Sequence, residues 1–268
     1  MKVMAIGNHK GGSAKTPATV QLAAAAAQRG HRVLVIDLDP QANASRRLGF
    51  RWSADDPVPT VSEAIKSAEY GIAGAAVVRS GWSNSLGERV DLIPSRWDLE
   101  QRISEAGQVG AFRRLAVALG DLPQEYDLTL IDLPPSLGHL THLGLAAADV
   151  ALAVVEPEYD SVEGATRYND FINTHATDLG NPGLVLAGVM VARVRSGLGE
   201  HSFQIEGLPD IFGPLLWTPH IPERAALKDA SSAGVPIQDI HSPAGREVAA
   251  IFEELAGKLE NLQKRAAA

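Results

Sequence analysis

The stretch that most constrains this chain is residues 3–16, which read Val-Met-Ala-Ile-Gly-Asn-His-Lys-Gly-Gly-Ser-Ala-Lys-Thr. The apolar start is typical of a buried strand, and the glycines, lysines and threonine that follow are typical of a turn leading into a helix. Such a turn presents backbone N–H groups at a helix N-terminus, where they bind phosphate. The sequence therefore predicts a phosphate-binding loop after the first strand.

The loop departs from the strict pattern G-x-x-x-x-G-K-[ST], because His9 and Ala14 occupy the two glycine positions. What remains is K-G-G-x-x-K-T over residues 10–16, with an extra lysine, Lys10, ahead of the glycines. With this loop the chain resembles the deviant Walker A ATPases of the ParA/MinD family, and ParA-like partition proteins in particular. The resemblance extends to residues 35–43, to residues 132–136, to residues 156–159 with 163–164, and to residues 221–224, in the family's order.

Strand and helix patterns alternate along the chain, which predicts an α/β fold with a doubly wound, mostly parallel sheet and helices on both faces. The resemblance implies a P-loop NTPase of the deviant Walker A type. A length of 268 residues fits one such domain, over residues 1–268. We expect strands at 2–7, 31–37, 89–93, 127–131, 149–155, 184–191 and 215–219, and helices at 16–29, 61–68, 97–106, 110–119, 161–174, 223–230 and 244–264; residues 197–212 give no clear pattern.

The composition is that of an ordinary globular protein, with 45% apolar and 21% charged residues. No run approaches the ~18 apolar residues of a membrane span, and the chain enters a strand directly rather than a signal peptide. The chain has 0 cysteines, which excludes disulfides and fits a cytoplasmic protein. Its net charge of -8 requires any DNA binding to be local, because proteins that hold DNA usually show a basic face.

Polyphosphate hydrolysis needs phosphate donors, a metal ion and a group that orients the attacking water. Gly11 and Gly12 lack a Cβ, so their N–H groups can approach phosphate closely. Lys15 is placed to reach the β- and γ-phosphates, and the Thr16 hydroxyl to ligate Mg²⁺. Asp132 ends an apolar run at the carboxyl edge of the sheet, which suits the Walker B role of holding Mg²⁺ through water.

The resemblance adds roles that the residues alone do not give. It implies that Asp39 orients the water and that Lys10 reaches across a dimer to the partner's phosphates; ATP or ADP and Mg²⁺ are the implied cofactors, and nothing in the sequence favours adenine over guanine. The residues expected to carry catalysis are Lys10, Lys15 and Asp39. Those expected to hold metal are Thr16, Asp39 and Asp132. Those expected to bind nucleotide are Lys10, Gly11, Gly12, Ser13, Ala14, Lys15, Thr16, Pro17, Pro219 and Pro222.

Two residues of the loop differ from the family. Ala14 replaces a glycine at a position that an anion nest would place at positive φ, where alanine costs about 1 to 2 kcal/mol. Pro17 replaces a threonine whose N–H typically donates to the α-phosphate, and proline has no such hydrogen. Losing one hydrogen bond to a charged acceptor costs about 1.5 to 3 kcal/mol, or roughly ten- to a hundred-fold in affinity. We therefore expect weakened nucleotide binding and weak ATP hydrolysis in a loop that still folds.

The resemblance to partition proteins also implies partners. ATP would close a homodimer that holds DNA non-specifically, which associates the protein with the nucleoid, and a ParB-like partner would stimulate hydrolysis. Candidate DNA-binding residues are Arg193, Arg195, Arg224, Lys228 and Arg246, although a set of ordinary solvated charges explains them equally well.

Three alternatives stay open at this point. A MinD-like membrane-cycling ATPase needs a basic amphipathic C-terminal helix, but residues 244–264 mix acidic and basic groups, so we expect their apolar stripe to pack in the core and no membrane partner. A catalytically weak adaptor would use the fold only to bind a partner. A nicotinamide-binding domain would need G-x-G-x-x-G, which is missing. The four tryptophans are expected in the core or at an interface: Trp52, Trp82, Trp97 and Trp217.

Overall fold

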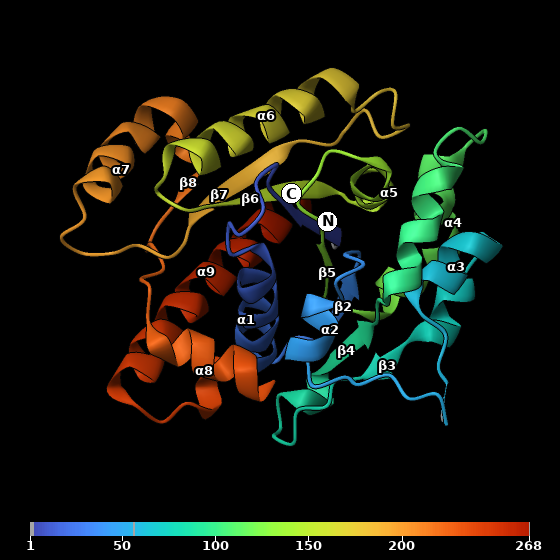
Figure 1. Ribbon diagram of the computed structural model, residues 1–268, viewed down its shortest axis with the longest axis horizontal. Coiled ribbons are helices and arrows are strands. Elements are labelled where there is room, and N and C mark those ends of the chain that lie inside the picture. The colour runs from blue at the N-terminus through green and yellow to red at the C-terminus, as the bar shows by residue number, and fades with distance from the viewer. Residues whose placement is uncertain (1–2, 56, 268) are drawn as a thin grey trace.

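The computed structural model describes residues 3–55 and 57–267, and it shows one central sheet with helices on both faces (Figure 1). Within these residues the sheet has eight strands in the order β3-β4-β2-β5-β1-β6-β7-β8. All neighbouring strands are parallel except β3 and β4, which are antiparallel. The strands are β1 Val3–Gly7, β2 Val33–Asp37, β3 Val78–Arg79, β4 Val90–Ile93, β5 Leu128–Asp132, β6 Val150–Val155, β7 Leu186–Val191 and β8 Leu216–Trp217.

The α-helices connect these strands and form the outer layers (Figure 1). They are α1 Lys15–Gln28, α2 Asn43–Arg47, α3 Val61–Ser67, α4 Arg114–Leu119, α5 His139–Ala147, α6 Tyr159–His175, α7 Gly199–Phe212, α8 Ala225–Ala233 and α9 Pro243–Ala267. The predicted doubly wound, mostly parallel sheet is confirmed. Lys2, the expected first residue of β1, lies outside the described residues.

Apolar residues alternate between two cores, one on each face of the sheet. On β1, Met4 and Ile6 join the core under α1 and α9, whereas Val3 and Ala5 join the core under α3 to α6. This follows from the strand geometry, in which successive side chains point to opposite faces. Because both faces are covered, the parallel strands are almost continuously apolar.

The expectation for residues 97–106 was wrong in type. Trp97–Glu105 forms a 3-10 helix rather than an α-helix. Only Leu99 and Arg102 are buried in it, and a spacing of three residues matches the three residues per turn of a 3-10 helix. The expected helix at 110–119 is likewise divided into a 3-10 turn, Ala111–Arg113, and α4.

The segment that gave no clear pattern folds as α7, with Pro209 inside the helix. Its glycines and proline have low helix propensity, so the helix depends on tertiary contacts. Leu208 and Phe212 bury its apolar side, and the His201 ring accepts a hydrogen bond from the Arg195 N–H. Strand β3 and helices α2 and α5 were also not predicted; the first two contain two and five residues, too few for a periodic pattern.

The last helix packs in the core, as its apolar stripe predicted. Leu255 and Leu259 are buried against α1, with Val248 and Phe252 beside them. The guanidinium of Arg29, directly after the end of α1, donates to Glu260 at 3.0 Å. Among the described residues, no helix is both long enough and apolar enough to cross a bilayer. The tryptophans divide: Trp82 and Trp217 are buried, whereas Trp52 and Trp97 are 38% and 70% exposed.

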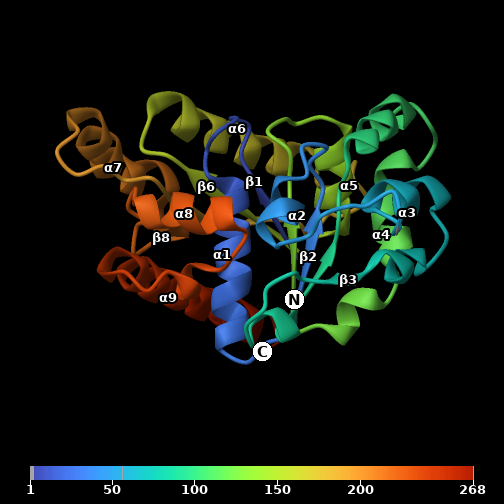
Figure 2. The ribbon, with the colours of Figure 1, turned by 60° about the horizontal axis from the view of Figure 1, so that its bottom comes forward.

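The carboxyl ends of the parallel strands meet at one edge of the sheet. The loop between β1 and α1 lies at this edge, which is the top of the molecule in Figure 2. The segments after β2 and β5 lie at the same edge, because these strands are parallel to β1 and pair with β5 and β1 respectively. Open α/β sheets bind their ligands at such an edge.

Candidate functional site

The loop between β1 and α1 has the backbone of an anion-binding nest. Gly12 has a φ of 85° and Ala14 a φ of 61°, and the Ala14 N–H donates to the Gly12 carbonyl at 2.8 Å. Ala14 therefore adopts the left-handed conformation that the loop was expected to require, despite its Cβ. Residues with positive φ turn successive N–H groups toward one side of the loop, where they can surround an anion.

Lys15 is buried at the start of α1, with a relative exposure of 6%. Its ammonium donates to the Lys10 carbonyl at 2.9 Å and contacts the Ser13 hydroxyl at 3.4 Å. Burial lowers the pKa of Lys15, while the negative charges of Asp132 and Asp39 act in the opposite direction. A cation that has lost its hydration in this way favours a nearby anion, which fits a phosphate ligand.

Asp132 ends β5 and is completely buried beneath the loop. Its carboxylate accepts hydrogen bonds from the Thr16 hydroxyl at 2.7 Å and the Thr19 hydroxyl at 3.0 Å. Burial, and next the charge of Asp37, raise the pKa of Asp132 to about 7, against the effect of these hydrogen bonds and of Lys15. A buried carboxylate that resists ionisation is stabilised by a divalent cation.

Thr16 and Asp132 fit a magnesium ion because they supply the hard oxygen ligands that Mg²⁺ prefers. Within the described residues, no cluster of three or more His, Cys, Asp or Glu side chains could hold a metal by itself. A Mg²⁺ site usually takes one or two protein ligands and completes its shell with phosphate and water oxygens. The metal would neutralise the charge that develops on a transferred phosphoryl group.

Asp37, the last residue of β2, and Asp39, just after it, lie at the same edge and have distinct roles. Asp37 is fully buried and accepts hydrogen bonds from the Ser45 N–H at 2.8 Å and the Ser45 hydroxyl at 2.7 Å. Burial raises its pKa to about 6. It fixes the turn that carries Asp39, whose carboxylate accepts from the Gln41 N–H at 2.9 Å and lines the phosphate cavity. Asp37 thus positions Asp39.

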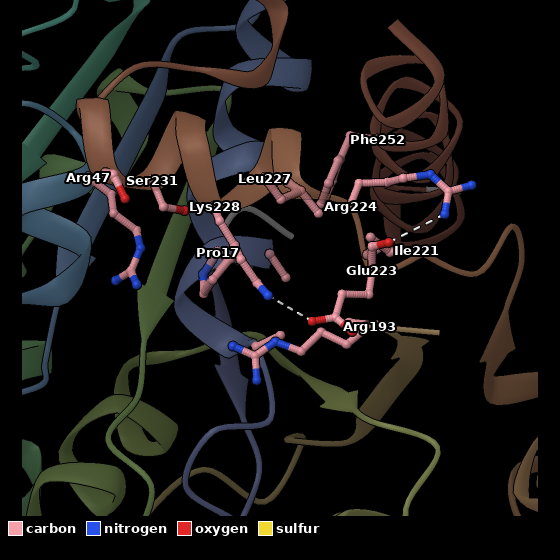
Figure 3. A pocket seen from close by; sticks show the side chains of 14 residues that line it. Pro17, Arg47, Arg193, Ile221, Glu223, Arg224, Leu227, Lys228, Ser231 and Phe252 are labelled. Atoms are coloured by element: carbon pink, nitrogen blue, oxygen red, sulfur yellow. Dashed lines mark hydrogen bonds and ion pairs between the residues drawn. The ribbon is translucent and has the colours of Figure 1, made fainter. Parts of the chain in front are cut away.

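Two cavities adjoin at the loop. The phosphate cavity, of about 240 Å³, is lined by residues 12–17, Asp39 and Pro135 among others. The side cavity, of about 220 Å³, lies between α1 and α8 and is lined by Ile221, Glu223, Arg224, Lys228 and Phe252 among others. Figure 3 shows Lys228 reaching across the side cavity to Glu223. Pro219 and Pro222 are not among its lining residues, although Ile221 and Glu223 on either side of Pro222 are.

Arg47 and Arg193 line both cavities, and the sequence did not suggest Arg47 at all. The Arg47 Nε is buried and has no hydrogen-bond partner among the described residues. Burial lowers the pKa of this guanidinium. An unpartnered buried donor in a cavity that also exposes Lys15 fits an anionic ligand such as a nucleotide phosphate. In the sequence, only the position of Arg47 at the end of the short helix α2, after the Asp39 turn, could have indicated that it lies at the site.

Lys10 does not face the phosphate cavity of its own chain. Its ammonium lies 3.2 Å from Glu158 Oε2 and 3.7 Å from Asp160 Oδ2, at the start of α6. Arg193 lies nearby, with its guanidinium 2.8 Å from the Gly12 carbonyl and 2.6 Å from Glu156 Oε1. These contacts connect the loop to the segment after β6. The resemblance seen in the sequence includes this segment as a motif of the family but gives its residues no role.

Four of the five basic residues considered for DNA binding are neutralised by carboxylates. Arg195 and Lys228 both bind Glu223, Arg224 lies 2.9 Å from Glu247, and Arg193 binds Glu156. The hydrogen bonds from Arg195 and Lys228 lower the pKa of Glu223 to about 2. Arg246 donates to the His241 carbonyl and has no carboxylate partner in the described part of the chain. The five side chains do not form an unpaired basic face.

Comparison with known proteins agrees with this geometry. A family model described as an AAA domain matches residues 1–184. Soj, the sporulation initiation inhibitor protein of Bacillus subtilis strain 168, is 33% identical over 240 residues, which cover 88% of this chain and 90% of Soj. This chain belongs to the ParA/MinD family of P-loop ATPases. Another family member, the chromosome partitioning protein ParA of Myxococcus xanthus, is 30% identical over 95% of this chain and 87% of its own length.

Solved structures of related proteins share the fold of this ParA/MinD family member. McdA of Cyanothece in complex with ATP superposes with a TM-score of 0.83 at 25% identity, over 97% of this chain and 96% of McdA. A Mycobacterium smegmatis protein described as cobyrinic acid a,c-diamide synthase, with bound ADP and magnesium, gives a TM-score of 0.79 at 27% identity, over 98% and 96% of the two chains. Both are nucleotide complexes, and both alignments span nearly the full length of the two chains.

Proposed function

We propose that this protein is a ParA-like DNA partition ATPase that binds ATP with Mg²⁺, closes into a homodimer around the nucleotide and hydrolyses ATP to ADP and phosphate. The observation that carries the proposal is the loop at residues 10–16, where a positive-φ backbone, the buried Lys15 and Thr16 line one cavity, and where the Thr16 hydroxyl donates to the fully buried Asp132. These are the parts that polyphosphate hydrolysis requires.

Each residue has a role in this proposal. The N–H groups of the loop and the Lys15 ammonium bind the β- and γ-phosphates, and Thr16 and Asp132 hold Mg²⁺. Asp39 lines the phosphate cavity and orients the attacking water. Lys10 crosses to the partner's phosphates once it leaves Glu158 and Asp160. The side cavity accepts the nucleoside part, with Ile221 and Glu223 in place of the flanking prolines that the sequence suggested.

Binding and turnover are weak in this proposal because of two residues. Pro17 supplies no N–H to the phosphate cavity that it lines, and Ala14 holds a left-handed conformation at a cost. The same two residues support a second candidate, a catalytically weak adaptor that binds nucleotide and a partner without significant turnover. Measuring phosphate release with and without DNA separates the two, because only the ATPase shows turnover that DNA or a partner increases.

DNA and a ParB-like partner belong to the proposal because relatives carry chromosome partitioning names. The ion pairs of Arg195, Arg224 and Lys228 leave little free positive charge in this conformation. We therefore propose that DNA binds the nucleotide-bound dimer only, and that this binding associates the protein with the nucleoid. A gel shift that requires ATP and weakens with salt supports this. A shift that is equal with and without ATP contradicts it.

Lys15→Ala tests the central proposal. Sedimentation velocity should show a dimer of the unchanged protein with ATP and Mg²⁺, and a monomer of the variant under the same conditions. Lys66→Ala is the matched control, because Lys66 is exposed on α3, away from the loop. This variant should dimerise as the unchanged protein does. A monomeric unchanged protein at saturating ATP, or a variant that still dimerises, overturns the proposal.

A further inference from the structure

A third cleft, which the proposed chemistry does not use, opens beside the Asp39 turn. It has a volume of about 450 Å³ and is lined by arginines and tryptophans, namely Arg46, Arg51, Arg96, Trp52 and Trp97. Its two tryptophans are 38% and 70% exposed, although large aromatic side chains are usually buried in a protein that has no partner. We name this feature the Arg–Trp cleft.

The chemistry of the Arg–Trp cleft favours an anionic, aromatic occupant. Its described lining contains three arginines and no carboxylate, on a chain with a net charge of -8. The Arg96 guanidinium lies 4.5 Å from the centre of the Trp52 ring and is already paired with Asp98 at 2.8 Å and Glu63 at 3.3 Å, whereas Arg46 and Arg51 have no ion pair within the described chain. The Ser95 hydroxyl in the wall is buried without a hydrogen-bond partner there. Arginine and tryptophan are the residues most enriched at binding hot spots.

A segment of matching chemistry lies on the same edge of the sheet, at residues 158–160. It reads Glu158-Tyr159-Asp160 and follows β6. Tyr159 is 65% exposed, and the side chains of Glu158 and Asp160 are 40% and 75% exposed. The only cation that the structure places on these two carboxylates, among the residues it describes, is Lys10. The segment therefore offers two negative charges around an exposed aromatic ring.

The strand order places the two features on opposite sides of the phosphate loop. The Arg–Trp cleft follows β2 and β4, on one side of the central pair β5 and β1, whereas the acidic segment follows β6, on the other side. A two-fold axis that passes between facing phosphate loops, perpendicular to the strand order, exchanges these sides, so that a surface after β6 in one protomer meets a surface after β2 in its partner. The same contact then occurs twice in the dimer.

We propose that in the nucleotide-bound dimer residues 158–160 of one protomer dock in the Arg–Trp cleft of the other, with Tyr159 against the tryptophans and Asp160 against Arg51. This inference rests on the proposed nucleotide-dependent dimer and names the surfaces that form it. Docking withdraws Glu158 and Asp160 from Lys10 and frees the lysine to cross the interface. Gln41 lines both the cleft and the phosphate cavity, so the contact also reaches the Asp39 turn.

Crosslinking tests the contact directly, because the natural sequence has 0 cysteines. One preparation carries Trp97→Cys and another Tyr159→Cys, and the mixture is treated with a short bismaleimide. We expect the mixture to form a covalent dimer with ATP and Mg²⁺ but not with ADP. Either preparation alone should form little covalent dimer. The matched control replaces Trp97→Cys by Val185→Cys, since Val185 is 52% exposed at the opposite, amino edge of the sheet and should give no crosslink.

Charge exchange gives a second readout. Arg51→Glu and Asp160→Arg should each weaken the ATP-dependent dimer roughly tenfold, and one chain carrying both changes should regain most of the affinity. If the unchanged protein dimerises with ATP but Trp97 and Tyr159 crosslink no better than the Val185 control, the docking is wrong and the proposed function stands. The docking is also overturned if the double variant dimerises with ATP no more tightly than the single variants do. If no dimer forms at saturating ATP, both proposals fall.

Discussion

Replacing Pro17 tests whether the phosphate loop of this chain lacks one hydrogen-bond donor. Lys15, Thr16 and Pro17 are the first three residues of α1, and the first main-chain bond of the helix runs from the Ala18 N–H to the Ala14 carbonyl at 3.0 Å. An N–H at position 17 would therefore have no partner within the helix. Because residue 17 lines the phosphate cavity, that N–H would be available to a bound phosphate.

The size of the effect follows from the charge of the acceptor. A hydrogen bond to a charged group contributes about 1.5 to 3 kcal/mol, so a restored N–H should tighten nucleotide binding roughly ten- to a hundred-fold. Pro17→Thr and Pro17→Ala both restore the N–H, but only threonine adds a hydroxyl. Similar gains from the two variants would assign the effect to the main chain, and a gain from threonine alone would assign it to the side chain.

Isothermal titration calorimetry with ATP and with ADP, both with Mg²⁺, measures the change. We expect both variants to bind both nucleotides more tightly, because the α-phosphate that the restored N–H is expected to meet is present in ATP and in ADP. The control is Pro209→Ala, which removes a proline inside α7, on another helix, and should leave affinity unchanged. Dissociation constants for both Pro17 variants within twofold of the unchanged protein would refute the reasoning.

The remaining predictions concern stability and the release of Lys10. Ala14→Gly should raise the free energy of unfolding by about 1 kcal/mol in urea titrations, because glycine adopts the left-handed conformation without a Cβ penalty. Raising the pKa of Asp132 from 3.8 to about 7 means that its contribution to stability is present below pH 4 and is lost as the pH rises through 7. Asp132→Asn should therefore raise the free energy of unfolding at pH 8, by up to about 4 kcal/mol, while Mg²⁺-dependent ATP binding disappears. Glu158→Gln should speed ATP-dependent dimerisation in stopped-flow light scattering, because Lys10 loses its nearest carboxylate.

Each of these predictions has a control or a contradicting result. An Ala14→Gly variant less stable than the unchanged protein would show that the left-handed conformation carries no cost. Unfolding of Asp132→Asn should match the unchanged protein more closely at pH 4 than at pH 8, and a difference independent of pH would exclude ionisation as its cause. Asp178→Asn is the control for Glu158→Gln, because it removes an exposed carboxylate beyond the end of α6 and should leave the rate of dimerisation unchanged. An unchanged rate for Glu158→Gln as well would show that Glu158 does not restrain Lys10.

Local patterns predicted the parts of the fold that depend on neighbouring residues. The apolar runs predicted β1, β2, β5, β6 and β7 to within about two residues, because a strand covered on both faces must be continuously apolar. The glycines and lysines of residues 10–16 predicted a phosphate loop, and the structure places Gly12, Lys15 and Thr16 around one cavity. The motifs also predicted the family, which the comparisons confirmed. The patterns failed at residues 97–106, where the same apolar spacing suits an α-helix or a 3-10 helix.

Only the tertiary structure decided which charges meet. Lys10 pairs with Glu158, and Arg193 pairs with Glu156, across separations in the chain that no periodic pattern encodes. The strand order sets these contacts, since parallel strands with distant sequence positions bring their carboxyl ends to one edge. The sequence by itself therefore determined the phosphate loop and the layers around it, through backbone conformation and apolar periodicity. The ion pairs of its arginines, the burial of Asp37 and the Arg–Trp cleft depend on the order of the strands in the sheet, which is a property of the folded chain.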